Sequence, residues 1–194
     1  TRCAIVTGVQ TCALPISRKN PGGKPSIRLW SAASSTGQEI YSIAMILVEM
    51  GITPDRYDIK LFGTDISDEA IAKASYGLYN KFEVSRGLDK KRLDRFFDKQ
   101  GDYYRIKDQI RVMAQFKKLN LMKPLTGFGK YDIILCRNVM IYFNPADRKR
   151  IYGNIAKALE PDGYLLIGST ESLSNDTDLF VSKKYLRSIF YQFK

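Results

Sequence analysis

The sequence predicts an α/β fold in which a mostly parallel sheet carries a small inserted subdomain and ends in an antiparallel pair of strands. Short apolar segments typical of buried strands alternate along the chain with longer segments of helical periodicity. Strands that alternate with helices form parallel sheets with right-handed crossovers. A basic segment interrupts the alternation, and the last two strand-like segments follow each other without a helix.

The chain has 194 residues, a length that suits one domain with at most one insertion. Residues 1–16 show no clear period and look like a translated sequencing adapter, so we expect this segment to be non-native and outside the fold. Residues 17–26 are polar and contain Pro and Gly, which is typical of a linker. The domain itself is expected over residues 27–194, with an inserted basic subdomain at about 77–118.

The first predicted unit is a short strand over 27–30, a loop of small residues, and a helix over 38–50 that Gly51 ends. A second strand is expected over 59–63. Ser67 is the predicted N-cap of the next helix, because a serine hydroxyl accepts hydrogen bonds from the first free amides of a helix. These segments give the β-α-β-α opening of a parallel sheet.

The basic segment follows. Residues 77–123 hold 13 Lys and Arg against 6 Asp and Glu, which accounts for most of the formal net charge of +11. A helix is expected over 88–99 and strands over 103–106 and 112–119, which together make an insertion of one helix and one hairpin. The charge suits an acidic macromolecular partner, and the alternative is an ordinary solvated face.

The alternation then resumes. The further elements expected are a strand over 131–136, a helix over 147–159, a turn at 161–163, a strand over 164–167, and a closing antiparallel pair over 179–181 and 188–193.

Composition excludes several kinds of site. The chain contains no histidine, so catalytic triads and metal centres built on imidazole are ruled out, and no metal site is expected. Its three cysteines have unrelated spacings and predict neither a disulfide framework nor a zinc site. No apolar run has the length of a membrane span, and the first residues lack the layout of a signal peptide. We therefore expect a cytoplasmic protein that does not insert into membranes.

Polar side chains gather where the predicted parallel strands end, which is where open α/β sheets bind ligands. The candidate binding residues in these positions are Glu39, Asp65, Asn120, Leu121, Arg137 and Asn138. We expect them to surround one pocket.

The types of these residues indicate the ligand. Asp65 at the end of the second strand suits the hydroxyls of a ribose. Glu39, near the start of a helix, would repel a pyrophosphate but would favour a cationic or hydroxyl-rich cofactor. S-adenosylmethionine (SAM) meets both demands, since it carries a ribose, an amino group and a sulfonium. The alternative is that both carboxylates only cap helices.

Five motifs also carry a family resemblance. In chain order they are WSAASSTGQEIYSIA, FGTDISDEAIAKASYGLY, FKKLNL, YDIILCRNVMIYF and PDGYLLIGSTES. Together, from about residue 27 to residue 193, they closely resemble the C-terminal SAM-binding domain of the CheR-family chemotaxis receptor (MCP) glutamate O-methyltransferases. The resemblance implies a Rossmann-like class I SAM-dependent methyltransferase sheet with an inserted β-subdomain. It also implies cofactor contacts at the six candidate positions and places Tyr142 beside the transferred methyl group.

The implied reaction moves a methyl group from SAM to glutamate carboxylates of receptors, leaving S-adenosylhomocysteine. A glutamate is already ionised at neutral pH, so the acceptor needs no general base, which agrees with the absence of histidine. The enzyme must chiefly hold oxygen, carbon and sulfur in line. Tyr142 is the expected catalytic residue, because its phenol can hydrogen-bond the carboxylate without losing its proton; the alternative is that it only packs.

Full-length family members also have an N-terminal helical domain that supplies further cofactor contacts, and no segment here matches it. We therefore expect weak cofactor binding and little turnover from this chain. The expected partner is the cytoplasmic helical region of chemotaxis receptors; the chain is expected to be a monomer and to bind no nucleic acid.

Two other functions stay open at this stage. One is an RNA methyltransferase, which the positive charge favours. Against it, the chain has no Asn-Pro-Pro-Tyr-like strand end, and Cys136 lies in a predicted buried strand where a nucleophilic thiolate is not expected. The other is a non-catalytic SAM-binding module.

Overall fold

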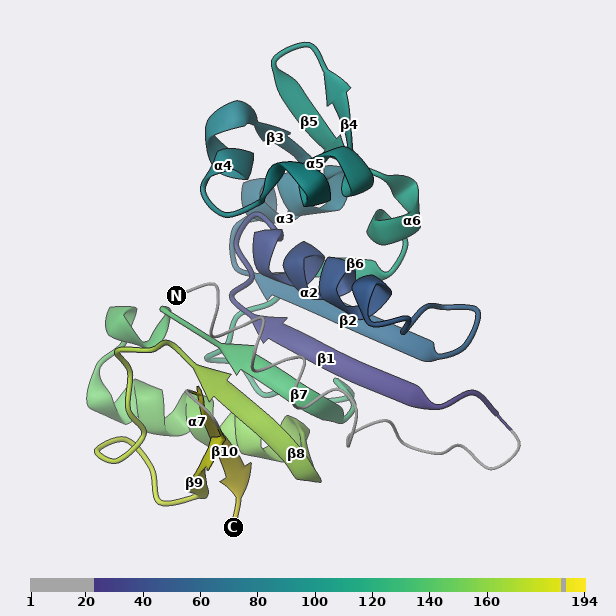
Figure 1. Cartoon of the computed structure of the whole chain (residues 1–194). Coiled ribbons are helices and arrows are strands. Elements are labelled where there is room, and N and C mark those ends of the chain that lie inside the picture. The colour runs from purple at the N-terminus through teal and green to yellow at the C-terminus, as the bar shows by residue number, and fades with distance from the viewer. Residues whose placement is uncertain (1–22, 186–187) are drawn as a thin grey trace.

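The computed structural model describes residues 23–185 and 188–194 (Figure 1). The expectations for residues 1–16, and for the linker as far as residue 22, lie outside the described residues. Ser26, the last residue of the predicted linker, already begins the first strand.

A seven-stranded sheet forms the centre of the fold, in the order β6-β2-β1-β7-β8-β10-β9. The strands are β1 (Ser26–Ala32), β2 (Asp58–Asp65), β6 (Ala114–Lys118), β7 (Tyr131–Cys136), β8 (Leu159–Ile167), β9 (Phe180–Tyr185) and β10 (Ser188–Phe193). The first five are parallel to one another, and β10 pairs antiparallel with both β8 and β9. The predicted α/β class, mostly parallel sheet and closing antiparallel pair are confirmed.

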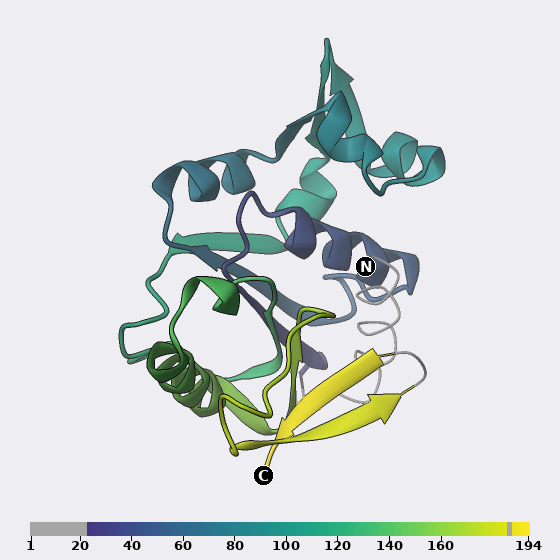
Figure 2. The ribbon, with the colours of Figure 1, turned by 90° about the vertical axis from the view of Figure 1, so that its left-hand side faces the viewer.

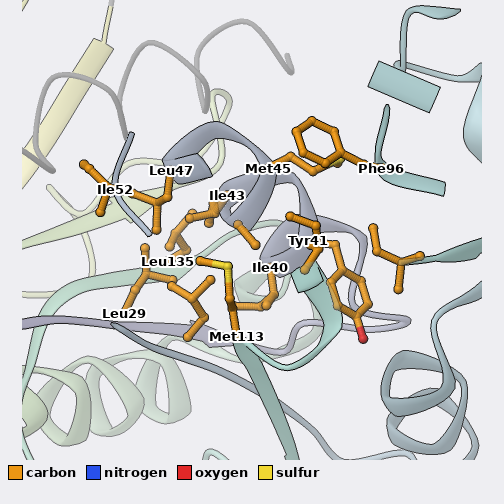
Figure 3. Packing of buried hydrophobic residues seen from close by; sticks show 14 of the residues in the cluster. Leu29, Ile40, Tyr41, Ile43, Met45, Leu47, Ile52, Phe96, Met113 and Leu135 are labelled. Atoms are coloured by element: carbon orange, nitrogen blue, oxygen red, sulfur yellow. The ribbon is translucent and has the colours of Figure 1, made fainter. Parts of the chain in front are cut away.

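Helices cover both faces of this sheet. Helix α2 (Gln38–Glu49) lies on one face and α7 (Pro145–Ala158) on the other, as Figure 2 shows. Because side chains alternate along a strand, Leu29 of β1 packs on the α2 side while Trp30 packs on the α7 side. Figure 3 shows Ile40, Ile43 and Leu47 of α2 lying against Leu29 and Leu135 of the sheet.

Two predicted helix boundaries, the N-cap at Ser67 and the stop at Gly51, are confirmed. Ser67 caps α3 (Asp68–Tyr76) by accepting a hydrogen bond from the amide of Ala70 at 3.2 Å. Gly51 follows α2 with φ of 73°, in the left-handed region where glycine ends helices at little steric cost.

The insertion forms a separate three-stranded sheet, which stands beyond α2 and α3 at the top of Figure 1. Its elements are β3 (Leu78–Asn80), α4 (Lys81–Ser85), α5 (Lys90–Phe96), β4 (Phe97–Gln100), β5 (Tyr103–Ile106) and α6 (Asp108–Arg111). The strand order is β3-β5-β4, with every pair antiparallel.

The hairpin predicted within the insertion was wrong. The segment predicted over 112–119 does form a strand, but this strand, β6, joins the large sheet parallel to β2. The hairpin partner of β5 is β4, which the sequence placed at the end of a helix over 88–99. Gly101 and the residue after it form a two-residue loop, and the φ of 60° at Gly101 suits the tight turn of a hairpin. This Gly-Asp pair is a hairpin signal, but the helical periodicity of residues 88–99 led us to predict a helix there instead of the strand β4.

The predicted turn at 161–163 lies within β8 as an irregularity. Tyr131 of β7 pairs with Leu159, whereas Ile133, two residues later, pairs with Tyr164. Residues 160–163 therefore lie outside the ladder, between the single pair at Leu159 and the regular pairing that begins at Tyr164.

Candidate active site

The strand order places the site. The chain runs from β1 outward to β2 and β6 and then returns to β7 on the other side of β1. Such a switch point leaves a crevice at the carboxyl ends of the central strands.

A pocket of about 360 Å³ lies at this edge. It is lined by Ala33, Ser35, Asp65, Ile66, Leu119, Asn120, Leu121, Asn138, Val139, Tyr142 and Phe143. The volume is in the range of small-molecule and cofactor sites. Four of the six predicted binding residues, Asp65, Asn120, Leu121 and Asn138, line it together with Tyr142.

Asp65 holds the backbone on two sides of the pocket. Its Oδ2 accepts a hydrogen bond from the amide of Ser35 at 2.9 Å, and its Oδ1 accepts one from the amide of Ser67 at 3.0 Å. Ser35 has φ of 49°, in the left-handed region, and Ala33 has φ of 60°. The carboxylate thus ties the loop after β1 to the end of β2, and its remaining lone pairs can accept hydrogen bonds from a ligand.

The two asparagines stand on separate loops of the pocket wall. Asn120 Oδ1 accepts a hydrogen bond from the amide of Met122 at 2.9 Å, which fixes the turn after β6. Asn138 follows β7 with φ of 57°. Leu121, between these polar groups, is buried and supplies an apolar surface.

Tyr142 ends the short 3₁₀ helix η1 (Met140–Tyr142) and is 77% exposed. Its neighbour Ile141 is also an exposed apolar side chain, and so is Ile66, another residue of the pocket lining. An exposed phenol on the lining of a pocket can reach a second substrate that arrives from solvent.

Glu39 and Arg137, the other two predicted binding residues, pair with each other. Arg137 Nη1 lies 2.7 Å from Glu39 Oε2, and the side chains are only 13% and 18% exposed. The other oxygen of Glu39 accepts a hydrogen bond from Ser31 Oγ at 2.8 Å. Neither residue is among those that line the pocket, so their role as cofactor contacts stays a prediction.

Sequence reasoning missed the apolar part of the wall, Ile66, Val139 and Phe143. The signal was available, because Ile66 directly follows Asp65 and the other two follow Asn138. It also gave no role to Glu171, whose carboxylate accepts a hydrogen bond from the amide of Asn138 at 3.0 Å.

Cys136 has no sign of a reactive thiol. Burial raises the pKa of its thiol well above the usual value, and the carboxylates of Glu171 and Glu39 raise it further. A buried neutral thiol is a poor nucleophile, which agrees with the expectation for this residue. In the described parts of the chain, no group of three or more Cys, Asp and Glu side chains could hold a metal ion.

Comparison with known proteins decides the family. A family described as CheR methyltransferase, SAM binding domain, matches residues 9–188. The chain belongs to this family. A chemotaxis protein methyltransferase from Vibrio parahaemolyticus is 39% identical over 177 residues, covering 88% of this chain and 63% of that protein. Chemotaxis protein methyltransferase 1 from Pseudomonas aeruginosa is 36% identical over 185 residues, covering 93% of this chain and 67% of that protein.

The CheR-family chain spans about 63% of the length of the first relatives that it matches. Solved structures agree on the fold. The SAM-bound magnesium protoporphyrin IX methyltransferase of Synechocystis is 14% identical with a TM-score of 0.52, covering 98% of this chain and 77% of that chain. A TehB-like SAM-dependent methyltransferase from Corynebacterium glutamicum is 14% identical with a TM-score of 0.51, covering 98% and 88%.

The cofactor named by the family fits the pocket. A ribose needs hydrogen-bond acceptors, and Asp65 provides a carboxylate there. An adenine ring needs apolar walls with polar groups at its edge, and Leu121, Phe143 and Asn120 all line this pocket. The residues present therefore suit SAM.

Proposed function

We propose that this chain transfers a methyl group from SAM to glutamate carboxylates of methyl-accepting chemotaxis receptors, forming methyl esters. One observation carries the proposal. A member of the CheR family brings Asp65, Asn120 and Asn138 into a single pocket whose wall ends in an exposed tyrosine, Tyr142.

Different residues of this chain would contact different parts of the cofactor. Asp65 would accept hydrogen bonds from the ribose hydroxyls, while Leu121 and the two asparagines would enclose the base. The methionine part of SAM carries one amino and one carboxylate group, which match Glu39 and Arg137 in charge. We therefore keep this pair among the proposed cofactor contacts. When bound, SAM supplies an electrophilic methyl group on a sulfonium.

The receptor glutamate that accepts the methyl group needs little acid–base chemistry from the protein. A receptor glutamate arrives as a carboxylate at neutral pH, so no residue has to remove a proton. Tyr142 can donate a phenol hydrogen bond to one carboxylate oxygen and leave the other free to attack. Correct orientation of reacting groups can lower a barrier by about 7–11 kcal/mol, and this is the contribution expected from the pocket.

The partner and the compartment follow from the same proposal. The substrate would be the cytoplasmic helical region of the receptors, so we place the protein in the cytoplasm. The basic insertion offers a surface for acidic receptor segments. Within residues 23–185 and 188–194, no helix is both long and apolar enough to cross a membrane.

The test incubates the protein with methyl-labelled SAM and either receptor cytoplasmic fragments or total RNA. We expect label on the receptor that alkali releases, as it does from a methyl ester. Label on RNA would favour the RNA methyltransferase, and cofactor binding without any transfer would favour a non-catalytic SAM-binding module.

A matched variant tests the role of Tyr142. Tyr142→Phe removes only the phenol oxygen, so transfer should slow about 10- to 100-fold, the effect of losing one hydrogen bond to a charged group. The affinity for S-adenosylhomocysteine should stay within about twofold. An unchanged rate would show that Tyr142 only packs.

A further inference from the structure

We propose that Glu171 is a positioning residue of the cofactor pocket. Its carboxylate fixes the backbone of Asn138 and so sets the affinity of the pocket for the cofactor. The inference rests on the proposed function, because it takes the pocket beside Asn138 to be the SAM site.

One carboxylate oxygen of Glu171 joins two loops. Oε2 accepts a hydrogen bond from the amide of Asn138 at 3.0 Å and another from the amide of Gly168 at 2.6 Å. The amide of Glu171 in turn donates to the carbonyl of Gly168 at 3.0 Å. The side chain is therefore held by its own tight turn while it reaches the loop after β7.

The location explains why a hydrogen-bond acceptor is needed. Strands β7 and β8 are neighbours, and the last pair of their parallel ladder is Cys136 with Ile167. The ladder ends at that pair, and the amides of Asn138 and Gly168 lie just beyond it. Glu171 Oε2 accepts from both, and charge-assisted hydrogen bonds of this kind are stronger than neutral ones.

The backbone that it fixes is an unusual one. Asn138 has φ of 57°, a region that residues with a side chain seldom adopt, although asparagine tolerates it best. Asn138 and the next residue, Val139, both line the pocket. A conformation of this kind persists only where the surroundings hold it, so loss of the Glu171 hydrogen bond should loosen this wall.

The junction where Gly168, Glu171 and Asn138 meet is closely packed. A Cβ added to Gly168 would lie 2.5 Å from Glu171 Oε2 and 3.1 Å from Asn138 Nδ2. The other oxygen of Glu171, Oε1, is buried and has no hydrogen-bond partner among the described residues. Glutamine could therefore keep its carbonyl oxygen on the two amides and place its NH₂ group where Oε1 now lies.

The test compares Glu171→Ala and Glu171→Gln by two measurements on the full chain. Hydrogen exchange, followed by NMR in the cofactor-free protein, reports the amides of Asn138 and Gly168. Calorimetry with S-adenosylhomocysteine reports affinity. We expect Glu171→Ala to speed exchange at both amides and to weaken binding, each about tenfold or more. Glu171→Gln should keep both within about threefold of the wild type.

Two further variants keep the result interpretable. Glu83→Ala removes a carboxylate of α4, in the insertion, that pairs with Lys73 of α3. Neither residue lines the pocket, so this variant should lower stability and leave affinity unchanged. Gly168→Ala should weaken binding by crowding the junction. If Glu171→Ala fails to fold, Gly168→Ala and Glu171→Gln still decide the matter.

Wild-type affinity in Glu171→Ala or Gly168→Ala, or equal damage by Glu171→Gln and Glu171→Ala, would overturn the inference. Asp65→Ala separates this failure from that of the proposed cofactor site. If Asp65→Ala weakens binding and Glu171→Ala does not, only the role of Glu171 is wrong. If Asp65→Ala has no effect, the cofactor site itself is wrong.

Discussion

The ion pair between Glu39 and Arg137 should contribute measurably to stability, because both side chains are largely removed from water. Their charged atoms lie 2.7 Å apart, with side-chain exposures of 18% and 13%. Two unit charges about 4 Å apart attract by about 4 kcal/mol at the effective dielectric constant of 20 that suits partly buried sites. Desolvation offsets part of this attraction, so we expect a net coupling of about 2 kcal/mol.

The single and double alanine variants measure this coupling. Arg137→Ala leaves the Glu39 carboxylate with the Ser31 hydroxyl as its one remaining side-chain partner among the described residues, and it should lower the free energy of unfolding by about 3 kcal/mol. Glu39→Ala should cost a similar amount, and the double variant should cost about 2 kcal/mol less than the sum.

Urea denaturation provides the assay. The chain has one tryptophan, Trp30, which is fully buried in the core and so reports unfolding by fluorescence. Because the pair is partly buried, moderate salt should change the coupling little. Additivity of the two single variants within about 0.5 kcal/mol would refute the reasoning, since it would mean that the two charges do not interact in solution.

Three further results are expected. Burial opposes ionisation of Glu83, but hydrogen bonds from Lys73 and a backbone amide lower its pKa. Glu83→Gln should therefore lower the free energy of unfolding by about 0.5 kcal/mol near neutral pH. Urea titrations should show that the difference in stability between wild type and variant vanishes as pH falls through the folded pKa of Glu83. Gly63→Ala would place a Cβ 2.6 Å from the Phe116 ring, so it should cost about 1–3 kcal/mol and lower Tm by several degrees in calorimetry. Because burial raises the pKa of the Cys136 thiol, this thiol should resist iodoacetamide until urea unfolds the protein, and peptide mass spectrometry would detect early labelling.

Local patterns were sufficient to predict most elements of the large sheet. Caps and stops such as Ser67 and Gly51 act within a few residues, so a sequence displays them directly. Strand pairing is decided by contacts between distant segments. The strand at 114–118 has the same local pattern whether it closes a hairpin or joins β2, and only tertiary packing chose the second.

In the site, too, some features could be predicted from the sequence and others depend on contacts between distant residues. The rule that ligands bind beyond the ends of parallel strands predicts that Asp65, Asn120 and Asn138 share one pocket, and all three line it in the structure. It could not reveal that Glu39 pairs with Arg137, because the two residues are 98 positions apart and each alone has the character of a ligand contact. Glu171 was equally hidden, since its partner Asn138 lies 33 positions earlier in the chain.

NMR chemical-shift mapping of the labelled protein, titrated with S-adenosylhomocysteine, tests most directly whether the pocket at the carboxyl ends of the central strands is the cofactor site. We expect saturable one-to-one binding, with the largest shifts at the amides of Ser35, Ile66, Leu121 and Asn138. The absence of saturable shifts, or shifts centred at the opposite edge of the sheet around Arg28, would contradict that assignment.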